Sequence, residues 1–72
     1  MKKINTIIKK TFKRLKKNEI YENLDLMKSG LIDSLELVKL LTLFEKKHEF
    51  NFKKYQKKHK NFIVKNLEKY IK

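Results

Sequence analysis

Ser34 is the residue of this chain whose setting indicates a chemical role. It stands in the stretch GLIDSLELV (residues 30–38), where a loop gives way to an apolar helical pattern. Asp33 is a residue type favoured at helix N-caps, and Glu36 follows three residues later, as a capping box requires. Ser34 would then lie in the first helical turn, beside unpaired backbone N–H groups, where a phosphate is favoured. This setting suits attachment of a phosphorylated group, although on these three residues alone a serine that only helps to begin a helix is the simpler interpretation.

Other kinds of chemistry find little support in the sequence. The chain has no cysteine, so it has no disulfide, thiolate metal site or cysteine nucleophile. His48 and His59 stand eleven residues apart, without cysteines or convergent carboxylates near them in sequence. There is no glycine-rich phosphate loop, and so small a domain could hardly enclose a Ser–His–Asp site. We therefore expect no enzyme, no catalytic residue and no metal site, and any thiol would have to be brought in from outside.

Length and composition predict one small all-α domain over residues 1–72. Proline is absent and Gly30 is the only glycine, which favours helices over turn-rich β structure. The longest apolar stretch, residues 37–44, is interrupted by Lys39 and Thr42 and is too short to span a membrane. Residues 1–12 lack the continuous apolar region of a secretory signal, so a cytoplasmic location is expected.

Charge is distributed unevenly along the chain. The formal net charge of +12 is typical of proteins that bind nucleic acid or anionic membranes. Residues 1–18, 19–45 and 46–72 carry +8, −4 and +8, so the stretch around Ser34 is acidic within a basic protein. A lysine-rich composition without alanine can also reflect the base composition of a genome, and we interpret the lysines of the first helix as a solvated face. Nucleic acid is therefore not the expected partner.

The spacing of apolar residues predicts the order of the elements. A first helix is expected over residues 3–17, then a long loop over 18–33 that packs onto the core, then a central helix over 34–49. A short helical turn is expected within 50–60, and a last helix from an Asn61 N-cap to about residue 71. Gly30 is expected to turn the chain into the central helix through a positive φ. The apolar faces of the three longer helices are Ile4, Ile7, Ile8, Thr11, Phe12 and Leu15, then Leu37, Leu40, Leu41 and Phe44, then Phe62, Ile63, Val64, Leu67, Tyr70 and Ile71.

Two further sets of residues could serve either the core or a binding surface. Phe50, Phe52 and Tyr55 stand among lysines and could stack on bases, but core closure is favoured because a short chain has little else to bury. A second, mixed arc of the central helix continues from Ser34 and suits the transient docking of partners, or else simply widens the core stripe. That arc consists of Ser34, Leu35, Val38, Thr42 and Glu45. Leu43 lies outside both arcs and has no assigned role.

Residues 29–41, SGLIDSLELVKLL, resemble the prosthetic-group segment of acyl carrier proteins, whose pattern is Asp-Ser-Leu followed by an apolar helix. The form Gly-Leu-Ile-Asp-Ser is most similar to stand-alone carriers of the D-alanyl type and of specialised pathways. The order of the remaining segments also resembles the layout of this family, over nearly the whole chain. The resemblance implies a small four-helix acyl-carrier-like bundle with three long helices and one short helix.

The resemblance also implies roles for individual residues. Ser34 would be the site where a phosphopantetheinyl transferase attaches 4′-phosphopantetheine from coenzyme A. Asp33 would cap the helix and help to engage the transferase and its magnesium ion. The arm would carry acyl or aminoacyl cargo as a thioester, loaded by a ligase and used by downstream enzymes, on a monomeric protein without catalysis of its own. The surface that faces partners would consist of Asp33, Leu35, Glu36, Val38 and Thr42.

Two features depart from the family. Its members are usually acidic throughout, whereas here only the stretch around the central helix is acidic, which is where partners would dock. His48 occupies a position where the family often has a core phenylalanine, and Phe50 could replace it. Two alternatives to a carrier therefore stay open: a small basic helical protein that binds nucleic acid or anionic membrane, and a degenerate carrier fold used as a structural subunit.

Overall fold

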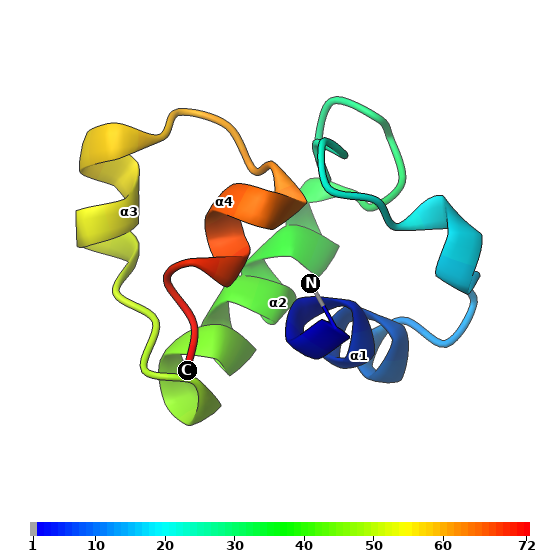
Figure 1. Ribbon diagram of the computed structural model, residues 1–72, viewed down its shortest axis with the longest axis horizontal. Helices are drawn as coiled ribbons and strands as arrows, with labels where there is room; N and C mark the ends of the chain where they lie inside the picture. The colour runs from blue at the N-terminus through cyan, green and yellow to red at the C-terminus, as the bar shows by residue number, and fades with distance from the viewer. Residues whose placement is uncertain (1) are drawn as a thin grey trace.

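The helices of this protein surround one shared core. The computed structural model describes residues 2–72, apart from the side chains of Lys2 and Lys17, so Met1 of the expected domain lies outside the described residues. The elements are α1 (Lys2–Thr11), a 3₁₀ turn η1 (Lys17–Glu19), α2 (Ser34–Lys47), α3 (Phe52–Lys58) and α4 (Val64–Glu68) (Figure 1). Residues 2–72 contain no strand beyond one isolated bridge, which confirms the all-α class and the four helices.

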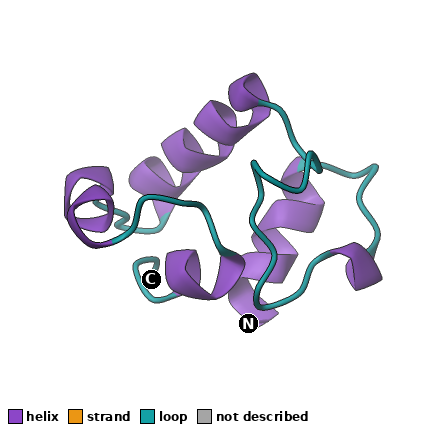
Figure 2. Ribbon diagram, turned by 90° about the horizontal axis from the view of Figure 1, so that it is seen from above, coloured by secondary structure: helices purple, strands orange, loops and turns teal. Residues whose placement is uncertain are grey.

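The core draws on every helix and on the loop between α1 and α2. In Figure 1 α2 crosses the middle of the molecule, with α1 on one side and α4 in front of it, and in Figure 2 α2 lies along one edge with α1 and α4 on its inner side. Burying apolar side chains from all segments is how so short a chain obtains a core. The buried residues are Ile4, Ile7, Ile8, Phe12, Leu15, Ile20, Leu24, Leu26, Ile32, Leu37, Leu40, Phe44, Phe50, Tyr55, Val64, Leu67 and Ile71.

The first helix is shorter than its sequence predicts. It ends at Thr11 instead of residue 17, and the chain continues in tight turns in which the Leu15 N–H donates to the Phe12 carbonyl at 3.0 Å. No glycine or proline interrupts residues 12–17, so the helix is ended by tertiary contacts. The turns keep Phe12 and Leu15 in the core, as predicted, and they direct Arg14 toward the start of α2.

The long loop lies on the core, which confirms the prediction for residues 18–33. Ile20, Leu24, Leu26 and Ile32 are buried, while hydrogen bonds order the backbone between them. The Asp25 carboxylate accepts the N–H groups of residues 27 and 28 at 2.9 and 3.0 Å, an Asx turn that residues of this type favour. The glycine at position 30 has a φ of 75°, as predicted from its position before α2.

The last helix begins later and is shorter than predicted. Ile63 is extended and forms a bridge with Asp25 in the loop. Around it, Leu26 N–H donates to the Phe62 carbonyl at 3.0 Å, and Val64 N–H donates to the Leu24 carbonyl at 2.9 Å. The Lys65 N–H donates to the Glu22 carbonyl at 3.0 Å, so loop carbonyls satisfy the first N–H groups of α4. This explains why Ile63, which has no capping side chain, replaces Asn61 as the N-cap residue.

The expected lengths of three long helices and one short helix are therefore wrong. The helices have 10, 14, 7 and 5 residues in chain order, so only α1 and α2 are long. The short turn expected within residues 50–60 is α3, which has Asn51 as its N-cap; the Asn51 side chain accepts the Lys54 N–H at 3.1 Å. Pairing with the loop takes the residues before Val64, and α4 also ends at Glu68, before the predicted residue 71.

The buried face of α2 is centred on Leu37, Leu40 and Phe44. Leu41 was expected in this core face but is only half-buried, because it lies at one edge of the stripe. Leu43 lies at the other edge, where it borders a hollow shared with Ile7 and other residues of α1. The two leucines thus flank the core stripe. Leu43 packs against the core from its edge, a role that the sequence did not indicate.

The carboxyl end of α2 folds back so that Phe50 can enter the core. Helix α2 ends at Lys47 instead of residue 49, and Glu49 has a φ of 51°, in the left-handed region. The Phe44 carbonyl accepts the N–H groups of both His48 and Phe50, at 2.8 and 3.2 Å. Phe50 is buried while His48 is half-buried with its ring against Phe44, so Phe50 fills the core as anticipated.

The aromatic residues near α3 close one side of the core, as favoured from the sequence. Tyr55 is fully buried, and its hydroxyl donates to the Asn61 carbonyl at 2.7 Å. The rings of Phe52 and Phe62 stack with centroids 6.5 Å apart, and both side chains are half-buried. These rings already cover one another, so they contribute to the fold.

Candidate functional site

The first turn of α2 is closed by the predicted capping box. Asp33 is extended, and its carboxylate accepts the Glu36 N–H at 2.8 Å. The Glu36 carboxylate returns to accept the Asp33 N–H at 3.1 Å. This reciprocal pair fixes where α2 begins, so Ser34 is the first residue of the helix, as the sequence predicted.

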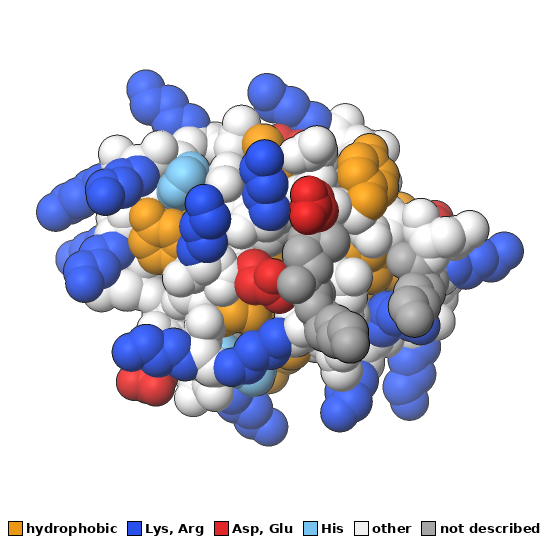
Figure 3. Space-filling model, in the orientation of Figure 1, with side chains coloured by type: hydrophobic (Ala, Val, Ile, Leu, Met, Phe, Trp, Pro, Cys, Tyr) orange, Lys and Arg blue, Asp and Glu red, His pale blue; other side chains and the backbone are white. Residues whose placement is uncertain are grey.

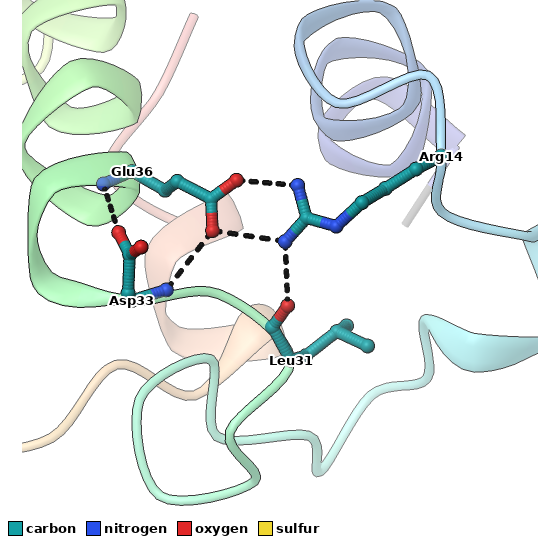
Figure 4. Close-up of polar contacts among 4 residues, drawn as sticks. All are labelled: Arg14, Leu31, Asp33 and Glu36. Carbon is teal, nitrogen blue, oxygen red and sulfur yellow. Dashed lines mark hydrogen bonds and ion pairs between the residues drawn. The ribbon is translucent and has the colours of Figure 1, made fainter.

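Arg14 joins the end of α1 to this capping box. Its guanidinium binds both carboxylate oxygens of Glu36, one of them at 2.9 Å, and also donates to the Leu31 carbonyl at 3.0 Å (Figure 4). This bidentate contact depends on the planar guanidinium group, and the ammonium group of a lysine could not form it. Three segments that are separate in the sequence therefore meet at the amino end of α2: the turn after α1, the loop, and the helix itself.

The hydrogen bond between Arg14 and Glu36 shifts the pKa values of both groups. The hydrogen bond from Arg14, together with the backbone bond to Asp33, lowers the pKa of the Glu36 carboxyl below its usual 4.5. The hydrogen bond to Glu36 in turn raises the pKa of Arg14. Both groups are reached by solvent, which screens their attraction. The pair is therefore ionised at neutral pH and acts mainly by fixing geometry.

Ser34 is exposed at the amino end of α2. Within residues 2–72 no group hydrogen-bonds its hydroxyl, and the backbone N–H groups of Ser34 and Leu35 likewise have no acceptor in that range. Unpaired N–H groups at a helix start favour a neighbouring anion. A phosphodiester on the Ser34 oxygen would thus be accessible and would lie next to free donors.

The expected partner surface is only partly outward-facing. Leu35 is 80% and Val38 60% exposed, and Thr42 is exposed one turn further along, with its hydroxyl on the Val38 carbonyl. Asp33 is exposed as well. Glu36 lies on the other side of α2, toward α1, where Arg14 occupies its carboxylate. The structure therefore brings four of the five expected residues to solvent near Ser34 and turns Glu36 away.

Four large apolar side chains of the described residues are exposed. They are Tyr21 and Met27 in the loop and Leu35 and Val38 in the first two turns of α2. Isolated exposed apolar residues are ordinary, but Leu35 and Val38 share one exposed face of α2 with Ser34, which suits a surface that contacts partners. Sequence spacing identified the two on α2 and left the two in the loop unassigned.

Arg14 is the residue of this site that sequence reasoning missed. In the sequence it contributed only to the charge of +8 over residues 1–18, yet it is the only arginine in a chain with 19 lysines. A single arginine among lysines could have indicated a specific contact, because the guanidinium group suits bidentate hydrogen bonds to a carboxylate. The acidic partner could not be chosen from the sequence, since Glu36 is 22 residues away.

Two further properties of residues 2–72 bear on the site. No helix in this range is long and apolar enough to cross a membrane. The same residues form no group of three or more histidine or acidic side chains that could hold a metal ion.

Comparisons with known proteins do not identify a relative. No protein-family model matches the chain, and neither the curated proteins nor the solved structures contain a match. Any functional proposal therefore depends on the site itself and on the resemblance of residues 29–41 to carrier proteins.

Proposed function

We propose that this protein is an acyl or aminoacyl carrier with a 4′-phosphopantetheine arm on Ser34. The observation that carries the proposal is the exposed Ser34 hydroxyl in the first turn of a firmly capped helix, beside two free backbone N–H groups. An acyl carrier needs no catalytic residues, because its cargo is held as a thioester on the thiol of the arm. That thiol also fits a chain without cysteine.

The geometry at Ser34 suits the attachment reaction. The Ser34 oxygen would attack the phosphorus of coenzyme A that bears the pantetheine, and the bond from that phosphorus to the adenosine-phosphate leaving group would break. The transferase would supply the magnesium ion and the base that takes the serine proton. The contribution of this chain is to hold Ser34 at a fixed helix start, which the Asp33–Glu36 box and Arg14 provide.

The surroundings of Ser34 suit recognition by partner enzymes. Leu35, Val38 and Thr42 offer a mixed apolar and polar surface, and Asp33 adds a negative charge in a locally acidic stretch. A transferase, a loading ligase and acyl-using enzymes with basic surfaces would be attracted to it. Glu36 would act indirectly by holding the first turn. We expect the carrier to be monomeric and cytoplasmic.

Intact-mass spectrometry tests the proposal. The full chain is incubated with a broad-specificity phosphopantetheinyl transferase, coenzyme A and magnesium, and the expected result is the addition of one phosphopantetheine arm. Ser34→Ala should stay unmodified. Ser29→Ala is a matched control, because Ser29 is exposed in the nearby loop and should leave modification intact. No addition with any of several transferases, or addition that persists in Ser34→Ala, would refute the carrier function.

A further inference from the structure

The basic surface around α3 is a second candidate interaction surface of this protein. Four of the seven residues of α3 are lysines, and all four are exposed. At about 100° per residue they fill one outward arc, opposite Tyr55, which is buried. We call this surface the α3 face, and it consists of Lys53, Lys54, Lys57, Lys58 and the following Lys60.

No acidic residue stands among these lysines in the sequence. Residues 51–67 contain six lysines and one histidine but no aspartate or glutamate. In the space-filling view, lysine side chains project around the left edge of the molecule, where α3 lies (Figure 3). Close like charges on a folded surface repel one another, so an anionic partner would relieve that repulsion.

We propose that the α3 face binds the surface of an anionic lipid bilayer. Clusters of four to eight lysines are attracted to anionic headgroups, and a fluid bilayer adapts to the lysines without requiring fixed geometry. Shallow hollows beside α3, one of about 410 Å³ between Lys54, Lys57, Lys58 and Tyr70, leave room for headgroups among the side chains. This proposal does not depend on the carrier function.

The composition of the α3 face favours a bilayer over a nucleic acid. Nucleic-acid recognition commonly uses arginine and free aromatic faces, whereas this surface has only lysines and its rings pack on one another. The large exposed apolar side chains of the described residues lie elsewhere, in the loop and the first turns of α2. Binding would therefore be superficial and electrostatic, and salt would reverse it.

The position of α3 leaves the candidate attachment site accessible. In both ribbon views α3 stands to one side, away from the first turn of α2 and the neighbouring loop (Figures 1 and 2). A protein adsorbed through α3 would thus keep Ser34 open to solvent and to enzymes.

Vesicle sedimentation of the full chain tests this proposal. Vesicles containing phosphatidylglycerol should bind the protein at low salt, whereas pure phosphatidylcholine vesicles, or high salt, should not. The triple variant K54Q/K57Q/K58Q should reduce the partition coefficient by roughly 100-fold, at about fivefold for each lysine. The matched control K3Q/K10Q/K13Q removes the same charge from exposed residues of α1 and the turn after it, and should bind much as the natural protein does.

Three outcomes would overturn the proposal. Equal loss in both triple variants would mean that net charge alone drives binding. Tighter binding to duplex DNA or to single-stranded RNA than to vesicles, at equal phosphate concentration, would assign the face to nucleic acid. No binding to anionic vesicles at low salt would remove the proposal entirely. Ser34→Ala should bind vesicles normally, which separates this test from that of the carrier function.

Discussion

Arg14 holds both carboxylate oxygens of Glu36 across 22 residues of sequence. Glu36 at the same time accepts the Asp33 N–H, and Arg14 at the same time binds the Leu31 carbonyl. One ion pair thus ties the turn after α1 and the end of the loop to the turn that bears Ser34. The conformation of that turn therefore depends in part on a contact between residues that are far apart in the sequence.

The Arg14–Glu36 pair should make the free energy of unfolding depend on pH in the acid range. The pKa of Glu36 is lowered in the folded protein, so its contribution is complete above the unfolded value of about 4.5 and is lost as pH falls through the lowered value. The stability difference between the natural protein and Glu36→Gln should therefore shrink from pH 7 to pH 3 in urea unfolding. Glu45→Gln, an exposed carboxylate on the same helix, is the control. Equal acid sensitivity of the natural protein and Glu36→Gln would contradict this account.

Leu35 and Val38 should matter for partners and not for folding. Because they are 80% and 60% exposed, Leu35→Ala and Val38→Ala should each change the free energy of unfolding by less than about 0.5 kcal/mol. If they contact the transferase, each should lower kcat/KM for modification of Ser34 by about fivefold to tenfold. Lys46→Ala, exposed at the other end of α2, should leave that rate unchanged. Normal kinetics in both leucine and valine variants would exclude this face from recognition.

Two adjacent leucines of α2 should differ in their contribution to stability. Leu40 is fully buried, so Leu40→Ala should cost about 2–5 kcal/mol by chemical denaturation. Leu41 is half-buried at the edge of the core, so Leu41→Ala should cost clearly less, about 1 kcal/mol. The reverse order would show that α2 is rotated about its axis relative to the structure described above.

The buried hydroxyl of Tyr55 should make the free energy of unfolding decrease at alkaline pH. Burial raises its pKa to about 12, so the unfolded chain loses this proton first, and stability should fall as pH rises from about 10 toward 12. Absorbance titration should show one of the three tyrosines ionising late. Tyr55→Phe removes the hydrogen bond to Asn61 at a cost of about 1 kcal/mol near neutral pH, and should reduce the alkaline loss. A Tyr55→Phe protein with an unchanged alkaline profile would assign the loss to other groups.

Features that depend on neighbours along the chain could be predicted from the sequence. Asp33 and Glu36 are three residues apart, so the start of α2 and the exposure of Ser34 could be predicted from local capping chemistry. Helical periodicity likewise placed Leu37, Leu40 and Phe44 in the core. The positive φ of Gly30 followed from the conformational freedom of glycine before a helix.

The end of α1 and the beginning of α4 depend on tertiary contacts and could not be predicted from the sequence. The first N–H groups of α4 find their acceptors on Leu24 and Glu22, and Arg14 finds its partner in Glu36, all of them distant in sequence. A hydrogen-bond donor pairs with an acceptor that packing of the core brings close to it. The periodicity of apolar residues does not indicate which acceptor that will be. The same packing gave Leu43 its place against α1 and left Leu41 half-buried at the edge of the core.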